Sequence, residues 1–126
     1  MKKLKTFYQS ELSVSDWENL LQDKDIFTKD ALIVLKRIKH VAAPTNSAKL
    51  ATVFGGSTLY YSNQIYNAAK KIKDKLQLLV KNECEWAILL DGYEGEITEK
   101  VFVLLPELNE ALENIDLSDI PLKNDK

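Results

Sequence analysis

The pattern of apolar residues between positions 47 and 77 predicts two helices joined by a sharp turn. A short helix over 47–54 would bury Leu50, Val53 and Phe54. Gly55 and Gly56 follow, and glycine adopts the positive φ of such a turn at no steric cost. A longer helix is expected at 61–77, because its apolar residues recur at three- and four-residue steps. Its predicted buried side consists of Tyr61, Ile65, Ala68, Ala69, Ile72 and Leu76.

Three further stretches have the same helical period. Ser13 or Ser15 is the expected cap of a helix that ends near residue 22 and buries Trp17, Leu20 and Leu21. Thr28 is the expected cap of a helix over 29–40, and Pro106 would open a last helix over 107–115. The inward residues of the helix over 29–40 would be Ala31, Leu32, Leu35 and Ile38, with Ile33 and Val34 widening the apolar side. Those of the helix over 107–115 would be Leu108, Ala111, Leu112 and Ile115.

The period changes after residue 79. Residues 85–90 and 100–105 are short apolar runs rich in strand formers, and the glycines of the segment 91–95 indicate a turn between them. We therefore expect a β-hairpin. The whole order predicts an α+β, mainly helical, winged-helix-like domain, in which a helix-turn-helix is followed by a β-hairpin and a C-terminal helix.

A chain of 126 residues has the length of one domain and can bury a sizeable core. We expect an N-terminal arm at 1–12, a single winged-helix-like domain at 13–120, and a polar tail or linker start at 121–126. The basic start lacks an apolar run, so neither a secretory signal nor a membrane anchor is predicted. Cys84 is the single cysteine, which agrees with a reducing compartment, and we expect a cytoplasmic protein.

Charge is distributed unevenly along the chain, although the formal net charge is only −2. Between residues 61 and 81 there are five lysines against Asp74 alone, whereas residues 83–119 hold eleven acids against Lys100. Any surface that binds an anion is therefore expected in the middle third of the chain.

The side of helix 61–77 that faces away from the core carries amide, hydroxyl and ammonium groups, which hydrogen-bond base edges and neutralise phosphates. It is our leading candidate for a DNA-binding surface. The alternative is that these lysines are only the solvated side of an amphipathic helix. The candidate DNA-binding residues are Ser62, Asn63, Tyr66, Asn67, Lys70, Lys71 and Lys73.

No pattern typical of an enzyme or of a cofactor site is present. His40 and Cys84 are each the only residue of their type, and no phosphate-binding glycine motif surrounds Gly55 and Gly56. We therefore predict no enzymatic activity, no cofactor and no catalytic residue, and we interpret His40 as a helix-end residue and Trp17 as core. A weak alternative is an acidic metal site with Lys100 nearby, using acids from among Asp91, Glu94, Glu96 or Glu99.

The order of several short motifs resembles the amino-terminal module found ahead of the GTPase in McrB-like, modification-dependent restriction proteins. Lys71 and Leu105 stand where that pattern has arginine. The motifs are residues 12–17, 25–27, 48–51, 54–55, 60–63, 69–72, 86–89 with Gly92, 102, 104–108 and 111–112.

The resemblance implies a recognition module of a phage-defence restriction system that binds DNA, modified DNA included. GTPase and nuclease activities would then lie in other domains or subunits. Aromatic candidates for stacking on a flipped base are Trp86, Tyr60, Tyr61, Tyr66 and Tyr93.

The alternative function is a protein-interaction or regulatory winged-helix domain that acts through its acidic hairpin and C-terminal helix. The two hypotheses differ in what covers helix 61–77. An open lysine-bearing surface favours DNA, whereas a surface covered by residues 83–105 favours a protein partner. No small-molecule cofactor or membrane partner is expected in either case.

Overall fold

A computed structural model describes residues 12–41, 45–78, 88–94 and 100–120; for residues 91–94, 100 and 101 it describes only the backbone. Within these ranges the chain forms five helices and two strands, so the prediction of a mainly helical α+β domain is confirmed. The elements are α1 (Val14–Leu21), α2 (Lys29–Val41), α3 (Ser47–Phe54), α4 (Thr58–Leu76), β1 (Leu90–Glu94), β2 (Lys100–Leu104) and α5 (Pro106–Asn114).

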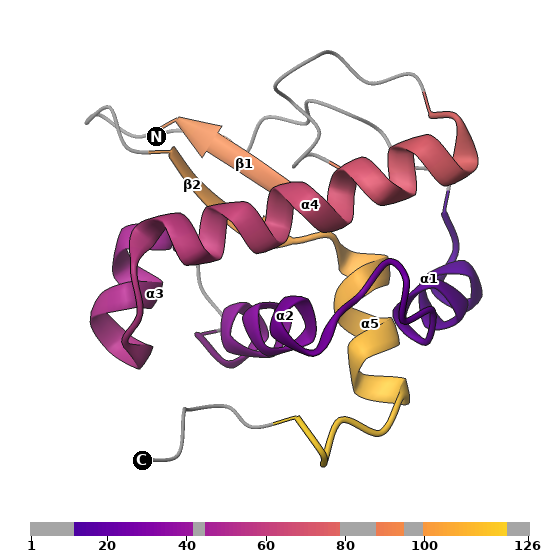
Figure 1. Ribbon diagram of the computed structural model, residues 1–126, viewed down its shortest axis with the longest axis horizontal. Helices are drawn as coiled ribbons and strands as arrows, with labels where there is room; N and C mark the ends of the chain where they lie inside the picture. The colour runs from indigo at the N-terminus through magenta and orange to yellow at the C-terminus, as the bar shows by residue number, and fades with distance from the viewer. Residues whose placement is uncertain (1–11, 42–44, 79–87, 95–99, 121–126) are drawn as a thin grey trace.

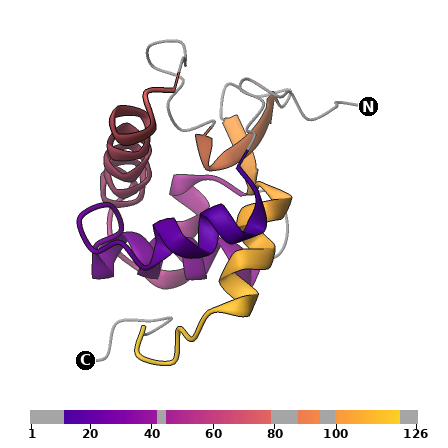
Figure 2. The same ribbon diagram turned by 90° about the vertical axis from the view of Figure 1, so that its right-hand side faces the viewer.

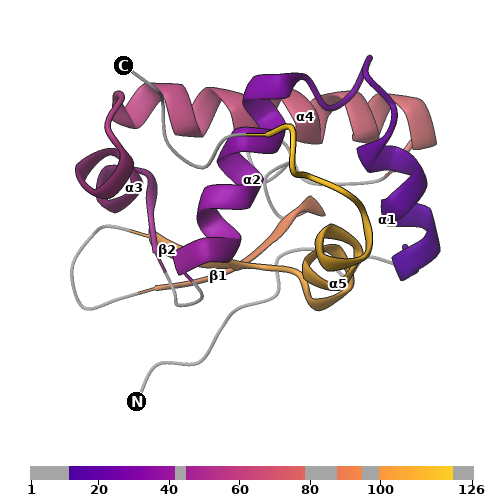
Figure 3. The same cartoon turned by 90° about the horizontal axis from the view of Figure 1, so that it is seen from below.

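Helix α4, the longest of the described elements, runs across the view of Figure 1 and lies along one side of the molecule in Figure 3. The hairpin and α5 lie on the opposite side, and α2 lies between them and α4 (Figures 2 and 3). Helix α1 packs against α5, and α3 packs against α4. Apolar side chains from all five helices meet in one core, with Trp17, Leu50, Ile72 and Leu108 fully buried.

The helix caps follow from local sequence. Ser13 accepts a hydrogen bond from the backbone N–H of Asp16, whose carboxylate accepts one from the N–H of Ser13 in return, so α1 begins with a capping box. Thr28 accepts from the N–H of Ala31 at the start of α2, as predicted. At α3 the cap is Asn46, which accepts from the N–H of Lys49.

The hairpin begins later in the chain than the apolar pattern predicted. Leu90 pairs with Leu104, and Glu94 pairs with Lys100 in antiparallel register, so β1 occupies the segment expected to be a turn. Ile88 and Leu89 form a buried turn, and the carbonyl of Leu89 accepts the N–H of Leu105 at 3.0 Å. The prediction of a strand at 85–90 was therefore wrong at 88–89, because a short buried apolar run suits a turn as well as a strand. Residues 85–87 lie outside the described ranges.

Two predicted core residues are also corrected. Val53 is 57% exposed and Leu76 is 38% exposed. Both lie in the last turn of a helix, where fewer neighbours surround a side chain than in its middle.

The segment between α2 and α3 joins the hairpin. The N–H of Thr45 donates to the carbonyl of Phe102 at 3.0 Å, and the N–H of Phe102 donates back to the carbonyl of Thr45 at 2.7 Å. This antiparallel bridge attaches the chain just before α3 to β2, on the side away from β1. It fixes where the α3–α4 pair sits relative to β2.

Residues 116–120 continue along the molecule after α5. The ammonium of Lys36 donates to the backbone carbonyls of Leu117 at 3.1 Å and Ile120 at 2.6 Å, and Leu117 packs against the core. These contacts attach the segment to α2.

Candidate nucleic-acid interface

Two positive-φ glycines and a serine cap position the start of α4. Gly55 and Gly56 have φ of 89° and 90°. The hydroxyl of Ser57 then accepts a hydrogen bond from the N–H of Tyr60 at 3.1 Å. Helix α4 therefore begins at Thr58, three residues before the predicted start. The missed signal was the Ser57 cap directly after the glycines.

The inner side of α4 is anchored by polar as well as apolar contacts. Arg37 of α2 is 1% exposed, and its Nη1 donates to the hydroxyl of Tyr61 at 2.7 Å. That hydroxyl donates in turn to the carbonyl of Gly55 at 2.7 Å. The Arg37 guanidinium also lies 5.3 Å from the ring centroid of Phe54. This network links α2, α3 and α4, and the sequence analysis did not identify it.

The outer side of α4 is open to solvent. Of the predicted DNA-binding residues only Lys73 is half-buried; the exposed ones are Ser62, Asn63, Tyr66, Asn67, Lys70 and Lys71. Leu59, which was not predicted, belongs to the same surface and is 59% exposed. We call these eight residues the α4 outer face.

Helical geometry orders the side chains on this face. Successive residues turn by about 100° around an α-helix, so Asn63 and Lys70 point almost directly away from the core. Lys71 and Lys73 then lie about 80° to either side of the Asn63 direction. The α4 outer face thus has a central line of amide, tyrosine and lysine groups with a lysine on each flank. Asp74, the one acidic residue of α4, also lies near this line.

Several contacts fix individual side chains of the face. The Lys70 ammonium lies 5.4 Å from the ring centroid of Tyr66, within range of a cation–π interaction. The hydroxyl of Ser62 lies 3.0 Å from that of Ser47, which connects α4 to the start of α3. Lys71 makes no ion pair with any residue that the structure describes.

The charge of Lys75, in the last turn of α4, is compensated by an acid. Its ammonium donates to the Asp23 carboxylate at 2.6 Å. This hydrogen bond lowers the pKa of Asp23, and a backbone hydrogen bond from Asp25 adds to the effect. The pair connects the end of α4 to the turn after α1.

The tyrosines proposed as stacking surfaces have different environments. Tyr61 is buried, and the hydroxyl of Tyr60 donates to the Asp30 carboxylate at 2.9 Å. Burial, and secondarily the hydrogen bond to Asp30, raises the pKa of Tyr60 to about 12. Tyr66 is 39% exposed, and the Lys70 ammonium lies against its ring. Trp86 and the side chain of Tyr93 lie outside the described residues.

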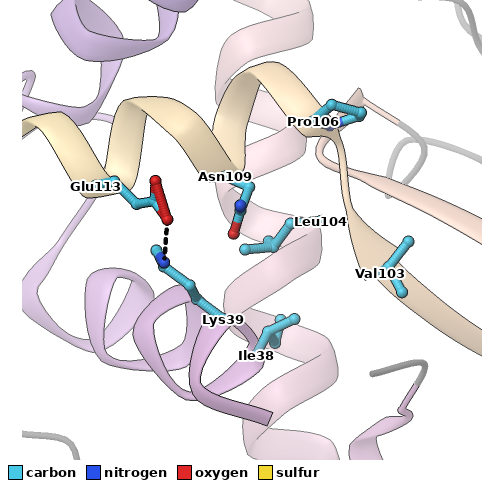
Figure 4. Close-up of a pocket in the computed structure, with 7 residues that line it drawn as sticks. All are labelled: Ile38, Lys39, Val103, Leu104, Pro106, Asn109 and Glu113. Carbon is cyan, nitrogen blue, oxygen red and sulfur yellow. Dashed lines mark hydrogen bonds and ion pairs between the residues drawn. The ribbon is translucent and has the colours of Figure 1, made fainter. Parts of the chain in front are cut away.

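The opposite side of the molecule is acidic and carries a surface pocket. Glu107, Glu110 and Glu113 are exposed on α5. A pocket of about 380 Å³ lies between α2, β2 and α5, and Lys39 and Glu113 form an ion pair of 3.1 Å at its edge (Figure 4). The residues that line it are Ile38, Lys39, Val103, Leu104, Pro106, Asn109 and Glu113.

The remaining sequence candidates do not form a second site among the described residues. Trp17 is fully buried, and exposed His40 packs edge-on to Phe54 with ring centroids 6.1 Å apart. Leu105 is 5% exposed, so its side chain belongs to the core. No group of three metal-ligating side chains occurs in the described part of the chain. The side chains of the weak acidic candidate lie outside that part: Asp91, Glu94, Glu96, Glu99 and Lys100.

Comparisons with known proteins do not place the chain in a family: no family model, no curated protein and no solved structure matches it. Among the described helices, none combines the length and the apolar character needed to cross a membrane.

Proposed function

We propose that this domain binds duplex DNA through the α4 outer face. The observation that carries the proposal is that this face is exposed except for half-buried Lys73, with lysines on both flanks of a line of amide, tyrosine and lysine groups. Lysines placed to either side of a helix match the two phosphate backbones that border a groove, and carboxamides match base edges. The hairpin does not cover the face, since α4 and the hairpin lie on opposite sides of the molecule (Figure 2).

The order of the elements also supports a winged-helix interpretation, in which α4 is the recognition helix. Helix α2 is followed by the Thr45 bridge, then by α3, α4 and the hairpin. The bridge adds a third segment to the hairpin on the β2 side. In helix-turn-helix domains the second helix of the pair enters the major groove, which corresponds to α4 here.

We further propose that the domain serves a modification-dependent restriction system. This part rests on the resemblance of the sequence to the DNA-recognition module of McrB-like proteins. It implies that other domains or subunits supply the motor and the nuclease.

Fluorescence anisotropy with labelled duplexes tests the proposal. Unmodified and cytosine-methylated duplexes are titrated at several salt concentrations with the wild type and with Lys70→Glu/Lys71→Glu. Each phosphate contact contributes roughly −0.9 to the slope of log K against log salt concentration, so the variant should lose about two contacts and about 2 from the slope. A preference for the methylated duplex would support the restriction role.

Binding that is independent of salt, or equal in the variant and the wild type, would contradict the role of the α4 outer face. Circular dichroism of the variant provides the control for folding. Both substituted side chains are exposed, so the helical signal should not change.

A second candidate function is docking of a protein partner at the α5 side. The observation that favours it is the pocket of Figure 4, which has an apolar floor beside exposed acids. Retained binding of a basic partner by Lys70→Glu/Lys71→Glu, with loss of that binding in Glu107→Lys/Glu110→Lys, would favour this function over DNA binding.

A further inference from the structure

The α4 outer face changes its chemistry along the length of the helix. Residues 58–69 contain no charged side chain, and their exposed groups include Leu59, Asn63 and Asn67. The lysines of the face all follow, from Lys70 onward. The first half of the helix therefore offers groups that discriminate between bases, whereas the second half offers charges that attract any phosphate.

The groups of the first half match one base pair better than the other. The carboxamide of asparagine can donate a hydrogen bond to N7 of adenine and accept one from its N6 amino group. Guanine is read mainly by arginine or lysine, and this half has neither. Leu59 adds an exposed apolar side chain, suited to the 5-methyl group of a pyrimidine.

The spacing of the two asparagines suits two separate base pairs. Asn63 and Asn67 are one turn apart, which corresponds to a rise of about 6 Å along the helix. Base pairs are stacked about 3.4 Å apart, so the two carboxamides would reach adenines roughly two steps apart. Neither carboxamide hydrogen-bonds to a residue that the structure describes.

We infer that the first half of α4 recognises A·T base pairs in the major groove, with Asn63 and Asn67 reading adenine and Leu59 contacting the pyrimidine methyl. This inference rests on the proposed function, because it requires α4 to lie in the groove. It adds a preferred substrate class to that function.

Three duplexes separate this recognition from its alternatives. A·T, G·C and inosine·C duplexes of equal length are compared by anisotropy at one salt concentration with the whole chain. Inosine lacks the minor-groove amino group of guanine, so I·C resembles A·T in the minor groove and G·C in the major groove. We expect the A·T duplex to bind on the order of tenfold or more tighter than both others, because a bidentate base contact discriminates by at least this factor.

The asparagines are then tested with a matched control. Asn63→Ala/Asn67→Ala should bind G·C and I·C with the affinity of the wild type, and should keep for A·T only the several-fold preference that the contact of Leu59 with the thymine methyl contributes. Asn19→Ala removes an exposed amide from α1 and should leave the preference unchanged.

The methyl contact has its own test. Replacement of thymine by uracil should weaken wild-type binding several-fold and leave Leu59→Ala unaffected. A duplex with 5-methylcytosine in G·C pairs shows whether the methyl group alone is recognised or only in combination with adenine.

The outcomes distinguish this inference from the proposed function. Salt-sensitive binding with no preference among the duplexes would overturn the inference and leave the proposed function standing. Equal binding of A·T and I·C would place recognition in the minor groove and would also overturn it. Absence of binding to every duplex would overturn both.

Discussion

Helices α4 and α5 are both amphipathic, and both bury one side in the same core, but their outer sides carry opposite charge. The α4 outer face has Lys70, Lys71 and Lys73, whereas α5 exposes Glu107, Glu110 and Glu113. The two helices lie on opposite sides of the molecule (Figure 2). The net charge of −2 therefore does not describe the local charge of either face. Because local potential rather than total charge governs association, this net charge does not argue against an anionic partner.

The inner sides of the two helices differ as well. Helix α5 packs through Leu108, Ala111 and Leu112, and its N-cap residue makes no side-chain hydrogen bond. Helix α4 adds to its apolar contacts the buried chain of hydrogen bonds from Arg37 through Tyr61 to the carbonyl of Gly55. Hydrogen bonds are directional, so they restrict the rotation and position of α4 more narrowly than apolar packing alone.

The largest expected effect comes from exchanging the charges of the two helices. The variant Lys70→Glu/Lys71→Glu/Glu107→Lys/Glu110→Lys has the same formal net charge as the wild type. We expect it to bind DNA at least about tenfold more weakly at low salt, because the phosphate contacts of α4 are lost. Anisotropy measures the affinity.

Glu107→Lys/Glu110→Lys alone is the matched control and should retain binding. Glu107 lies in the first turn of α5, where the helix dipole favours acids, so the control can lose about 0.3–1 kcal/mol of stability. Wild-type affinity in the fourfold variant would show that net charge, not its location, decides binding.

An intermediate effect, on stability, is expected from two tyrosines of α4. Tyr61→Phe removes the hydroxyl that joins Arg37 to the carbonyl of Gly55, so the buried Arg37 guanidinium loses this hydrogen bond. It should lower the free energy of unfolding by about 1–3 kcal/mol. Tyr66→Phe makes the same chemical change on the α4 outer face and should cost no more than about 0.5 kcal/mol. Urea denaturation of both variants measures the difference, and equal losses would contradict the anchoring role of the network.

Periodicity was sufficient to predict the helices but not their exact ends. Apolar spacing located all five, and the residues on the outward side of α4 are exposed with the exception of half-buried Lys73. The predicted burial of Val53 and Leu76, in the last turns of their helices, was wrong, because exposure at a helix end depends on how far neighbouring elements extend. The predicted position of the first strand was wrong at 88–89 for a related reason: the run 88–90 is buried, and burial does not distinguish a turn from a strand.

The polar anchor of α4 could not be predicted from sequence for a different reason. Arg37 lies on the apolar side of α2, and a charged residue at such a position is normally assigned to the surface. Its burial depends on a hydroxyl 24 positions later in the chain, which no local pattern reveals. The same holds for Lys75, whose partner Asp23 is 52 positions away.

The smallest expected effect compares two lysines of the same helix. Lys71 makes no ion pair within the described part of the chain, whereas the charge of Lys75 is compensated by Asp23 at 2.6 Å. Lys71→Gln should therefore reduce the salt slope of DNA binding by about one contact, and Lys75→Gln should leave the slope unchanged. Salt titrations of the two variants measure this difference. An equal reduction in both would extend the DNA-binding surface around α4 to Lys75.

Lys75→Gln should have a separate effect on Asp23. The hydrogen bond from Lys75 lowers the pKa of this carboxyl group, so its loss should raise the pKa toward the ordinary value, as measured by NMR titration of the carboxyl carbon. Because the pKa is lowered in the folded state, the pair stabilises the fold above the ordinary aspartate pKa. This contribution disappears as the pH falls through the lowered value. The stability difference between wild type and variant should therefore vanish in acid, and a difference that persists there would have to come from packing of the Lys75 side chain instead.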